Sequence, residues 1–362
     1  MRIDQLLPVL GGHDAIAAHV LQVRTALRAA GFESDIYADV VDARHAGVRP
    51  WLDGPGRISP DRVVLYHAST HAPLAPWLVQ RGRRGERIVV DYHNVTPSAY
   101  FRRWLPDAAD EMDAARAELA ALAPVTGLAL ADSGFNQAEL VELDFRPTAT
   151  APLLVDLAAY HQPPDEPTLA RLRRQRERGG AAWLFVGRIA PNKCQHDLLA
   201  AFAVYRRLAD PAARLTLVGG ATAPAYLAAI ERMIDELDLE PAVEIASGVG
   251  HAELLAHFAT ADAFVCLSEH EGFCVPLLEA MELGLPIVAH PAAAVPETVG
   301  DAAVLVADKD PLTVATAVAE LLADEPRRLA LVEAGRRRAR RFELATTAAE
   351  LVGHLTAHLA GA

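Results

Sequence analysis

Two glutamates, Glu271 and Glu279, lie eight positions apart in the apolar stretch SEHEGFCVPLLEAMELGLPIVAH, residues 268–290. Glu279 falls about two turns into a helix-like run, where a carboxylate is costly to bury unless it meets hydrogen-bond donors. The hydroxyls of a ribose would be such donors. Gly272 frees the backbone of the turn, so that successive N–H groups can point at a phosphate or a sugar hydroxyl. Two carboxylates could also be the acid and base of a hydrolase. Because these two flank a helix start, we expect them to face two parts of one ligand.

Two cations follow an earlier apolar run. Arg188 ends AAWLFVGR, and Lys193 follows five residues later, just before a helical segment. A guanidinium fork, an ammonium point charge and a helix N-terminus together suit a diphosphate. A surface arginine and lysine on a loop is the plainer interpretation. Lysine is rare here, however, since only Lys193 and Lys309 occur among 34 basic residues, and this favours a functional role.

Other residues that follow apolar runs are weaker candidates. His93 comes after RIVVDY and His67 after RVVLY. Each could project into a ligand site, although single histidines are more often structural. Gly11 and Gly12 precede a helical segment and would let a phosphate approach the backbone. An ordinary tight turn fits them equally well, and no dinucleotide-binding or P-loop fingerprint occurs in the chain.

Two clusters resemble metal sites without the required spacing. Cys266, His270 and Cys274 are four residues apart, but the spacing crosses a strand end and a glycine rather than one helix. Asp308 and Asp310 form an Asp-x-Asp that is better interpreted as a charged loop after a strand. We therefore expect no metal ligands in this chain.

Short apolar runs alternate with segments of helical period along the whole chain. The expected strands are 3–10, 33–39, 62–68, 87–93, 127–133, 181–188, 213–220, 242–248, 261–268, 285–290 and 302–308. The first helix is expected between Asp14, as its cap, and Gly31. Strand, helix, strand repeats of this kind predict α/β domains with parallel sheets, in which ligands lie beyond the carboxyl ends of the strands.

A change in amino-acid composition divides the chain. At 362 residues it is too long for one ordinary core. The stretch HQPPDEPTLARLRRQRERGG, 161–180, is rich in proline, then charged, then ends in Gly-Gly. We predict two doubly wound, Rossmann-like domains facing a central cleft. Their predicted extents are 1–162 and 181–342, with a linker and solvated helix at 163–180 and a C-terminal helix at 343–362 that crosses back to the first domain.

Charge and cysteine content exclude some classes of protein. A net charge of −13 argues against nucleic acid as a partner, because phosphate backbones need a basic face. Three cysteines imply no disulfide framework and favour a reducing compartment. The first residues lack a signal-peptide layout, and no apolar run is long enough to span a bilayer. We expect a cytoplasmic protein, and peripheral contact with the inner face of the membrane stays open.

Together and in this order, these residues resemble the family-four retaining glycosyltransferases of the GT-B fold. The similarity is strongest from Phe185 to Phe342. FVGRIAPNKCQHDLLAAF resembles the family's strand, Gly-Arg, loop, lysine and helix, and SEHEGFCVPLLEAMELGLPIVA resembles its two-glutamate signature. GGHDAI, YHNVTP and ADSGFNQAEL extend the resemblance diffusely into the first half.

The resemblance implies roles for particular residues. Arg188 and Lys193 would hold the diphosphate of a sugar nucleotide. Glu279 would bind the ribose hydroxyls, and Glu271 would bind hydroxyls of the donor sugar. Backbone contacts to sugar and phosphate are implied for Gly272, Phe273, Cys274 and Val275.

Three further roles come from the same resemblance. His93 would lie near the sugar and the reacting centre, Gly12 would face the phosphates from the other domain, and backbone near Val249 would contact the base. One departure concerns Cys274, where the family usually has glycine. Its side chain would narrow the donor site or fill a gap.

The implied reaction is transfer of a hexosyl group from a nucleotide-diphosphate sugar to a hydroxyl acceptor, with retention at the anomeric carbon. Cations and helix N-termini, rather than a metal, would neutralise the diphosphate. The co-substrate would be a GDP- or UDP-sugar, with GDP-mannose suggested by the relatives, and no other cofactor is required. The acceptor would be a glycan or glycolipid intermediate of cell-surface polysaccharide synthesis. A sugar-nucleotide epimerase or hydrolase, and a non-catalytic binding subunit, remain alternatives.

Overall fold

The computed structural model describes residues 1–11, 15–42, 45 and 47–360. The expected helix cap Asp14 lies outside these residues. The chain forms two compact units. Unit 1 contains residues 1–99, 107–155 and 342–362, and unit 2 contains residues 100–106 and 156–341.

Unit 1 is built on a seven-stranded parallel sheet. Its strands are β1 (Arg2–Leu10), β2 (Ile36–Val41), β3 (Val48–Pro50), β4 (Arg62–Ala68), β5 (Arg87–Tyr92), β6 (Thr126–Ala131) and β7 (Thr148–Thr150). The strand order is β3-β2-β1-β4-β5-β6-β7, and each pair is parallel. The order reverses between β1 and β4, which makes this a doubly wound sheet. Every residue of β4 is buried, as expected for a central strand covered on both faces.

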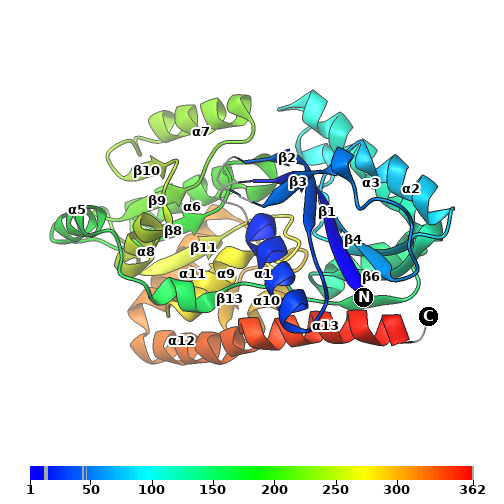
Figure 1. Ribbon diagram of the computed structural model, residues 1–362. Helices are drawn as coiled ribbons and strands as arrows, with labels where there is room; N and C mark the ends of the chain where they lie inside the picture. The colour runs from blue at the N-terminus through cyan, green and yellow to red at the C-terminus, as the bar shows by residue number, and fades with distance from the viewer. Residues whose placement is uncertain (12–14, 43–44, 46, 361–362) are drawn as a thin grey trace. The chain divides into compact units, whose positions relative to one another are not determined.

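The helices of unit 1 include one from the far end of the sequence. They are α1 (Ala15–Ala29), α2 (Leu74–Gly82), α3 (Pro106–Leu122), α4 (Gly134–Glu142) and α13 (Leu344–Ala360), and short 3-10 turns lie at Trp51–Asp53, Ser98–Tyr100 and Ala123–Val125. Helix α13, drawn in red in Figure 1, lies beside α1. Its Leu351 and Leu355 are fully buried in a core cluster that also contains Val23 and Leu27 of α1. The C-terminal helix therefore completes the core of the first half of the chain.

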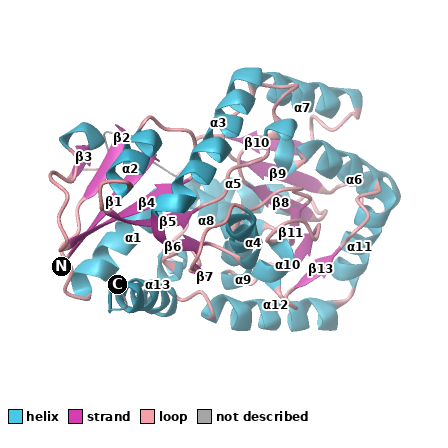
Figure 2. Cartoon of the chain, turned by 90° about the vertical axis from the view of Figure 1, so that its right-hand side faces the viewer, coloured by secondary structure: helices cyan, strands magenta, loops and turns pink. Residues whose placement is uncertain are grey.

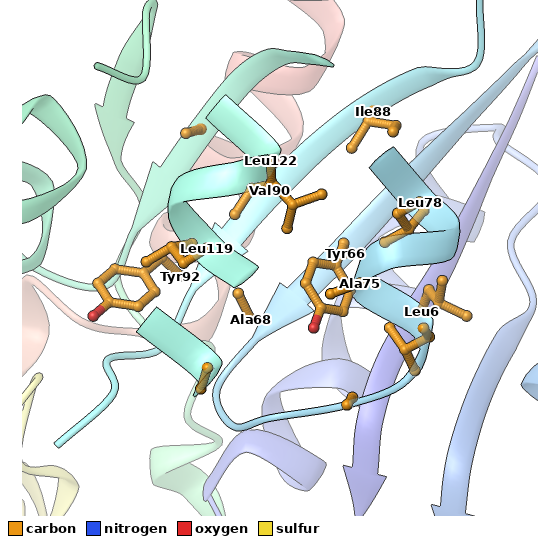
Figure 3. Close-up of a cluster of buried hydrophobic side chains, with 14 of the residues drawn as sticks. Leu6, Tyr66, Ala68, Ala75, Leu78, Ile88, Val90, Tyr92, Leu119 and Leu122 are labelled. Carbon is orange, nitrogen blue, oxygen red and sulfur yellow. The ribbon is translucent and has the colours of Figure 1, made fainter. Parts of the chain in front are cut away.

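A second core cluster of unit 1 lies under α2 and α3 (Figure 3). Leu78 of α2 and Leu119 of α3 pack there with Tyr66 and Val90, which come from the adjacent strands β4 and β5. These apolar strands are held firmly in register, and this fixes the positions of the polar residues at their carboxyl ends.

Unit 2 is built on a six-stranded parallel sheet. Its strands are β8 (Ala182–Val186), β9 (Arg214–Val218), β10 (Val243–Ala246), β11 (Ala263–Cys266), β12 (Ile287–Ala289) and β13 (Ala303–Leu305). The order is β10-β9-β8-β11-β12-β13, so the direction of winding reverses between β8 and β11. Figure 2 shows strands of this sheet as neighbouring magenta arrows.

Helices separate these strands in sequence. They are α5 (Glu166–Arg176), α6 (Gln195–Leu208), α7 (Pro224–Glu236), α8 (His251–Thr260), α9 (Val275–Glu282), α10 (Val295–Val299), α11 (Pro311–Ala323) and α12 (Glu325–Arg340), and two 3-10 helices are η4 (Leu157–His161) and η5 (Pro191–Lys193). Aspartates cap several of them, including α5 and α11. Asp165 accepts a hydrogen bond from Thr168 N at the start of α5, and Asp310 accepts from Leu312 N and Thr313 N at the start of α11.

The sequence-based description of residues 161–180 needs a refinement. The segment is helical at α5, but Leu169 and Leu172 are buried and pack with Ala256 of α8. Only the outer face of this helix is solvated, and the helix belongs to unit 2.

The expected elements agree with the fold except at two sheet edges and in the position of the second strand. Strands β3 and β7, each of three residues, were not predicted because neither has an apolar run long enough to be recognised. The second strand was placed three residues early, at 33–39 rather than Ile36–Val41. Among the helices that the structure describes, none has the length and hydropathy to cross a membrane.

Candidate functional site

The direction of winding in unit 2 reverses between two central strands, β8 and β11, and we call this place the switch point. In doubly wound sheets, ligands bind beyond the carboxyl ends of the strands at such a point. The loops that leave these strands are residues 187–194 and 267–274. They contain Arg188, Lys193 and Glu271, three of the residues selected from the sequence.

Lys193 and Glu271 meet directly across these two loops. Lys193 Nζ lies 2.6 Å from Glu271 Oε2, and the two side chains are 14% and 7% exposed. The pair balances two charges that would be costly to bury singly. It also fixes the ammonium at the switch point, where a diphosphate could be received.

Backbone and side-chain contacts hold the two loops together. Asn192 Nδ2 donates to the backbone oxygen of His270 at 3.2 Å, and Glu269 N donates to the backbone oxygen of Asn192 at 2.9 Å. Lys309 Nζ lies 2.5 Å from both Asp197 Oδ2 and Glu269 Oε1. The interpretation of Asp308–Asp310 as a merely charged loop was therefore incomplete, because its lysine binds the loop after β11 to the start of α6.

The turn from β11 into α9 has a backbone conformation that explains Cys274. This residue has φ 70° and ψ 69°, in the left-handed region, and it immediately precedes α9. Glycine reaches this region at little cost, so a glycine would be the ordinary residue at this position. The Cys274 side chain is buried rather than projecting into solvent, so it fills space within unit 2. Gly272 is half-buried and Phe273 is buried, and the Phe273 carbonyl accepts a hydrogen bond from Thr298 Oγ1.

Glu279 is buried on α9, with 6% of its surface exposed. The hydroxyl of Tyr160, from η4, donates to Glu279 Oε1. The other oxygen, Oε2, is also buried and has no hydrogen-bond partner in the described part of the chain. Buried polar atoms are normally paired, so this oxygen is suited to accept a bond from a ligand hydroxyl.

The environment of Glu279 also changes its ionisation. Burial raises the pKa of Glu279 to about 7, despite the opposing effect of the Tyr160 hydroxyl. Tyr160 is itself positioned by His251, whose ring lies edge-on at 5.1 Å between centroids. Near neutral pH this carboxyl group therefore exchanges readily between its neutral and ionised forms.

The remaining donor-site candidates are less constrained. Arg188 is exposed in the loop after β8, and within the described ranges its guanidinium makes no ion pair. Val249 is half-buried two residues before α8, and Val275 is the half-buried first residue of α9. Gly12 lies outside the described residues.

The cysteines near this site form a different group from the one considered in the sequence. Ligand atoms of Cys266, Glu271 and Cys274 lie within 4.8 Å of one another, and His270 is not part of this group. The thiols are free, and Cys266 Sγ donates to Ser268 Oγ at 3.3 Å. Both thiols are buried, and the carboxylate of this group is also paired with Lys193.

His93 and His67 come together inside unit 1. His67 Nδ1 lies 2.9 Å from His93 Nε2, and His93 Nδ1 lies 2.9 Å from Asp132 Oδ1. Neither imidazole has any exposed side-chain surface. Burial lowers the pKa of His67 to about 4. Burial would raise the pKa of Asp91, but the histidines around it, with His93 first, hold that pKa well below its usual range.

Some residues at these sites were not recognised from the sequence. Tyr160 lies 119 positions before Glu279, and only the fold brings them together. Asp91 and His19 read as ordinary members of a strand and a helix. The one hint that the sequence offers for Asp91 and His19 is that an ionisable side chain stands among apolar residues of a strand or helix.

Known proteins resemble the part of the chain that contains these loops. Residues 173–338 match the family described as glycosyl transferases group 1. This stretch of the chain is therefore similar to a group 1 glycosyltransferase domain. This domain spans the two loops at the switch point and both signature glutamates, and it confirms the resemblance found in the sequence.

Curated relatives and solved structures extend the comparison of the group 1 domain. The chain is 34% identical over 183 residues to a GDP-mannose-dependent alpha-(1-6)-phosphatidylinositol monomannoside mannosyltransferase of Mycolicibacterium smegmatis, covering 48% of this chain and 47% of that protein. The chain thus spans about half the length of the curated relatives it matches.

Two solved structures share the fold across the whole chain. A sucrose-phosphate synthase from Thermosynechococcus elongatus has a TM-score of 0.77 at 20% identity, covering 100% of both chains. HepE of Anabaena in complex with UDP-glucose has a TM-score of 0.79 at 17% identity, covering 99% of this chain and 100% of that one. The fold is the GT-B fold that the sequence predicted, with two doubly wound parallel-sheet units.

Proposed function

We propose that this protein is a retaining hexosyltransferase that moves a sugar from a nucleotide-diphosphate sugar to a hydroxyl acceptor. The observation that carries the proposal is the buried Oε2 of Glu279, which has no hydrogen-bond partner among the described residues and lies on the helix that follows the Lys193–Glu271 ion pair. An acceptor atom for a ribose, an ammonium for a diphosphate and a carboxylate for a sugar then all come from the loops after β8 and β11 and from helix α9, which follows the second of these loops.

In this proposal the residues of unit 2 divide the donor among them. Glu279 Oε2 accepts a hydrogen bond from a ribose hydroxyl, while Tyr160 keeps Oε1 occupied and the carboxylate oriented. Lys193 and Arg188 neutralise the diphosphate, with N–H groups at the start of α9 as further donors. Glu271 then orients the hydroxyls of the sugar. It is a positioning group, because its Oε2 already contacts Lys193.

The proposed donor and acceptor follow from the relatives. The mycobacterial relative is named as GDP-mannose-dependent, and HepE was solved with UDP-glucose. We propose a GDP- or UDP-sugar as donor, with GDP-mannose tested first. We propose as acceptor a glycan or glycolipid of cell-surface polysaccharide synthesis, which the enzyme would meet in a reducing cytoplasm at the inner membrane face. The mycobacterial relative, named for phosphatidylinositol monomannoside, supports a glycolipid acceptor.

Binding and turnover test this proposal in two steps. A thermal-shift panel with UDP, GDP, ADP, dTDP and CDP in the presence of EDTA should give a selective rise in melting temperature. The matching nucleotide sugar is then incubated with and without a lipid or glycan acceptor. Release of nucleotide diphosphate that depends on the acceptor supports a transferase. Release without an acceptor indicates a hydrolase or epimerase, and binding without turnover indicates a binding subunit. Equal nucleotide binding by wild type, Lys193→Ala and Glu279→Ala would reject the donor site.

A further inference from the structure

A buried polar network lies at the carboxyl ends of the central strands of unit 1. Its members are Gln5 of β1, His19 of α1, His67 of β4, Asp91 of β5, His93 just after β5 and Asp132 just after β6. All six are buried, and His19, His67 and Asp91 have no exposed surface. A network this enclosed must place each of its protons between protein atoms.

The contact between His67 and His93 is a hydrogen bond rather than a pair of metal ligands. Ligand atoms of His19, His67, Asp91 and His93 do lie within 4.8 Å of one another. However, the His67 and His93 rings are within 10° of parallel, with centroids 5.2 Å apart and nitrogens 2.9 Å apart. The centroid separation is as long as this N···N contact and the two ring radii allow, so the nitrogens point straight at each other. Ligands of one metal ion instead converge on a common point.

The proton of His19 can be placed from the backbone. Leu154 N donates to His19 Nδ1 at 2.9 Å, so Nδ1 carries a lone pair. The ring proton is therefore on Nε2, which donates to Asp91 Oδ2 at 3.0 Å. This arrangement makes His19 a neutral imidazole in a single tautomer.

The other two histidines need one proton more than two neutral rings supply. His93 Nδ1 faces the Asp132 carboxylate at 2.9 and 3.2 Å, so it donates there. With the Gln5 amide oriented as in the structure, where its Nε2 has no partner among the described residues, His67 Nε2 faces Gln5 Oε1 at 2.9 Å and donates as well. Each ring has then used the single proton of its neutral form. The 2.9 Å contact between His67 Nδ1 and His93 Nε2 still requires a hydrogen.

The charges around this contact favour an additional proton. Asp91 Oδ2 lies 3.3 Å from His67 Nδ1 and 3.6 Å from His93 Nε2. Asp91 and Asp132 are both buried, and across the described ranges neither forms an ion pair with a lysine or an arginine. Burial raises the pKa of Asp132, and a charged His93 beside it opposes that effect, so an imidazolium is the cation that the network can offer to both carboxylates.

We propose that His93 is doubly protonated at neutral pH, donating to Asp132 through Nδ1 and to His67 through Nε2. Asp91 and Asp132 are the positioning residues that keep this charge in place. His93 then cannot accept a proton from an acceptor hydroxyl, and it contributes a fixed positive charge near the ends of β4 and β5. Only this catalytic consequence rests on the proposed transferase function.

Histidine NMR on the full-length protein tests the protonation directly. In protein labelled with ¹⁵N-histidine, long-range ¹H–¹⁵N spectra distinguish an imidazolium from both neutral tautomers. At about pH 8, where an ordinary histidine is neutral, we expect one imidazolium pattern in wild type. It should be absent from folded Asp132→Asn and retained in His71→Gln, whose ring is 43% exposed and pairs with Glu118.

The outcomes separate this inference from the proposed function. The proposed imidazolium would be refuted if His19, His67 and His93 were all neutral at about pH 8 in folded protein, with the Gln5 amide turned to donate to His67. So would an imidazolium that persists in both Asp132→Asn and Asp91→Asn.

In transfer assays, Asp132→Asn should lower kcat about tenfold or more with an unchanged donor KM, as expected for losing a charge-assisted hydrogen bond. An unchanged kcat would remove the catalytic consequence. A wild type without transfer activity would reject only the proposed function, since the spectra do not depend on turnover.

Discussion

The ionisation of Glu279 should make nucleotide-sugar binding depend on pH near neutrality. A ribose hydroxyl that donates to Oε2 binds the ionised carboxylate better than the protonated acid. Burial raises the pKa of this group to about 7 in the free protein. Affinity should therefore fall as the pH is lowered through this value, and binding should release a proton.

The size of the effect follows from that pKa. With a pKa near 7, the ionised fraction is about tenfold smaller at pH 6 than at pH 8, so the dissociation constant should rise about tenfold. The same pKa shift makes the stability of the folded protein depend on pH in the opposite direction, so that stability falls as the pH rises. The folded-state pKa lies above the ordinary value of 4.5, so this group's stabilising contribution is complete below pH 4.5 and is lost as the pH rises to about 7. That contribution is about 3 kcal/mol.

Titration calorimetry with the nucleotide sugar at about pH 6, 7 and 8 measures the effect. The intact donor is preferable to a free nucleotide diphosphate, because its diphosphate carries no group that titrates in this range. Glu279→Gln is the matched variant. It keeps the side-chain shape and an oxygen for Tyr160, but it cannot ionise. Its affinity should be lower than that of ionised wild type and independent of pH. A wild-type affinity that does not change over this range, or an equal slope in Glu279→Gln, would refute the assignment of Glu279 as the titrating ribose ligand.

Three further substitutions test other parts of unit 2. Tyr160→Phe leaves both oxygens of Glu279 without a donor in the free protein, and chemical denaturation should show a loss of about 1–3 kcal/mol. Lys309→Met removes the cation between two carboxylates, so donor KM should rise severalfold and the melting temperature should fall; an unchanged KM would mean that these loops do not need this anchor. Gly219→Ala should destabilise the protein by more than about 3 kcal/mol, because a Cβ there would lie 2.1 Å from a backbone carbonyl oxygen at φ 150°. Gly220→Ala is the control, since its Cβ would meet nothing within 4 Å and stability should be unchanged.

The fold could be predicted where apolar runs were long and central in a sheet. The expected strand at residues 62–68 matches β4 at both ends, because every residue of that strand is buried and the pattern is continuous. At the sheet edges this signal is missing. Strand β3 consists of Val-Arg-Pro and β7 of Thr-Ala-Thr, and neither shows the pattern of a buried strand. Their pairing is decided by their neighbours rather than by their own residues.

The candidate site was predictable where its residues are close in sequence. Glu271 and Glu279 can be recognised as carboxylates in an apolar segment, and Lys193 can be recognised because lysine is rare in this chain. The partner of Glu279 was not predictable, because Tyr160 is an unremarkable residue near a linker until the chain folds. His93 was selected as a single residue near the reacting centre. Its enclosure by other ionisable side chains depends on strand register, which one sequence does not reveal.

The return of α13 to unit 1 has a consequence for the order in which the protein is made. Unit 2 is nearly continuous in sequence, and its last residue, Arg341, is synthesised before α13. Unit 1 begins at the first residue, but its core lacks Leu351 and Leu355 until the final helix is available. During translation, unit 2 can therefore complete its core on the ribosome while the earlier-made unit 1 still exposes an apolar surface. The half that is synthesised first is therefore the half whose core is completed last.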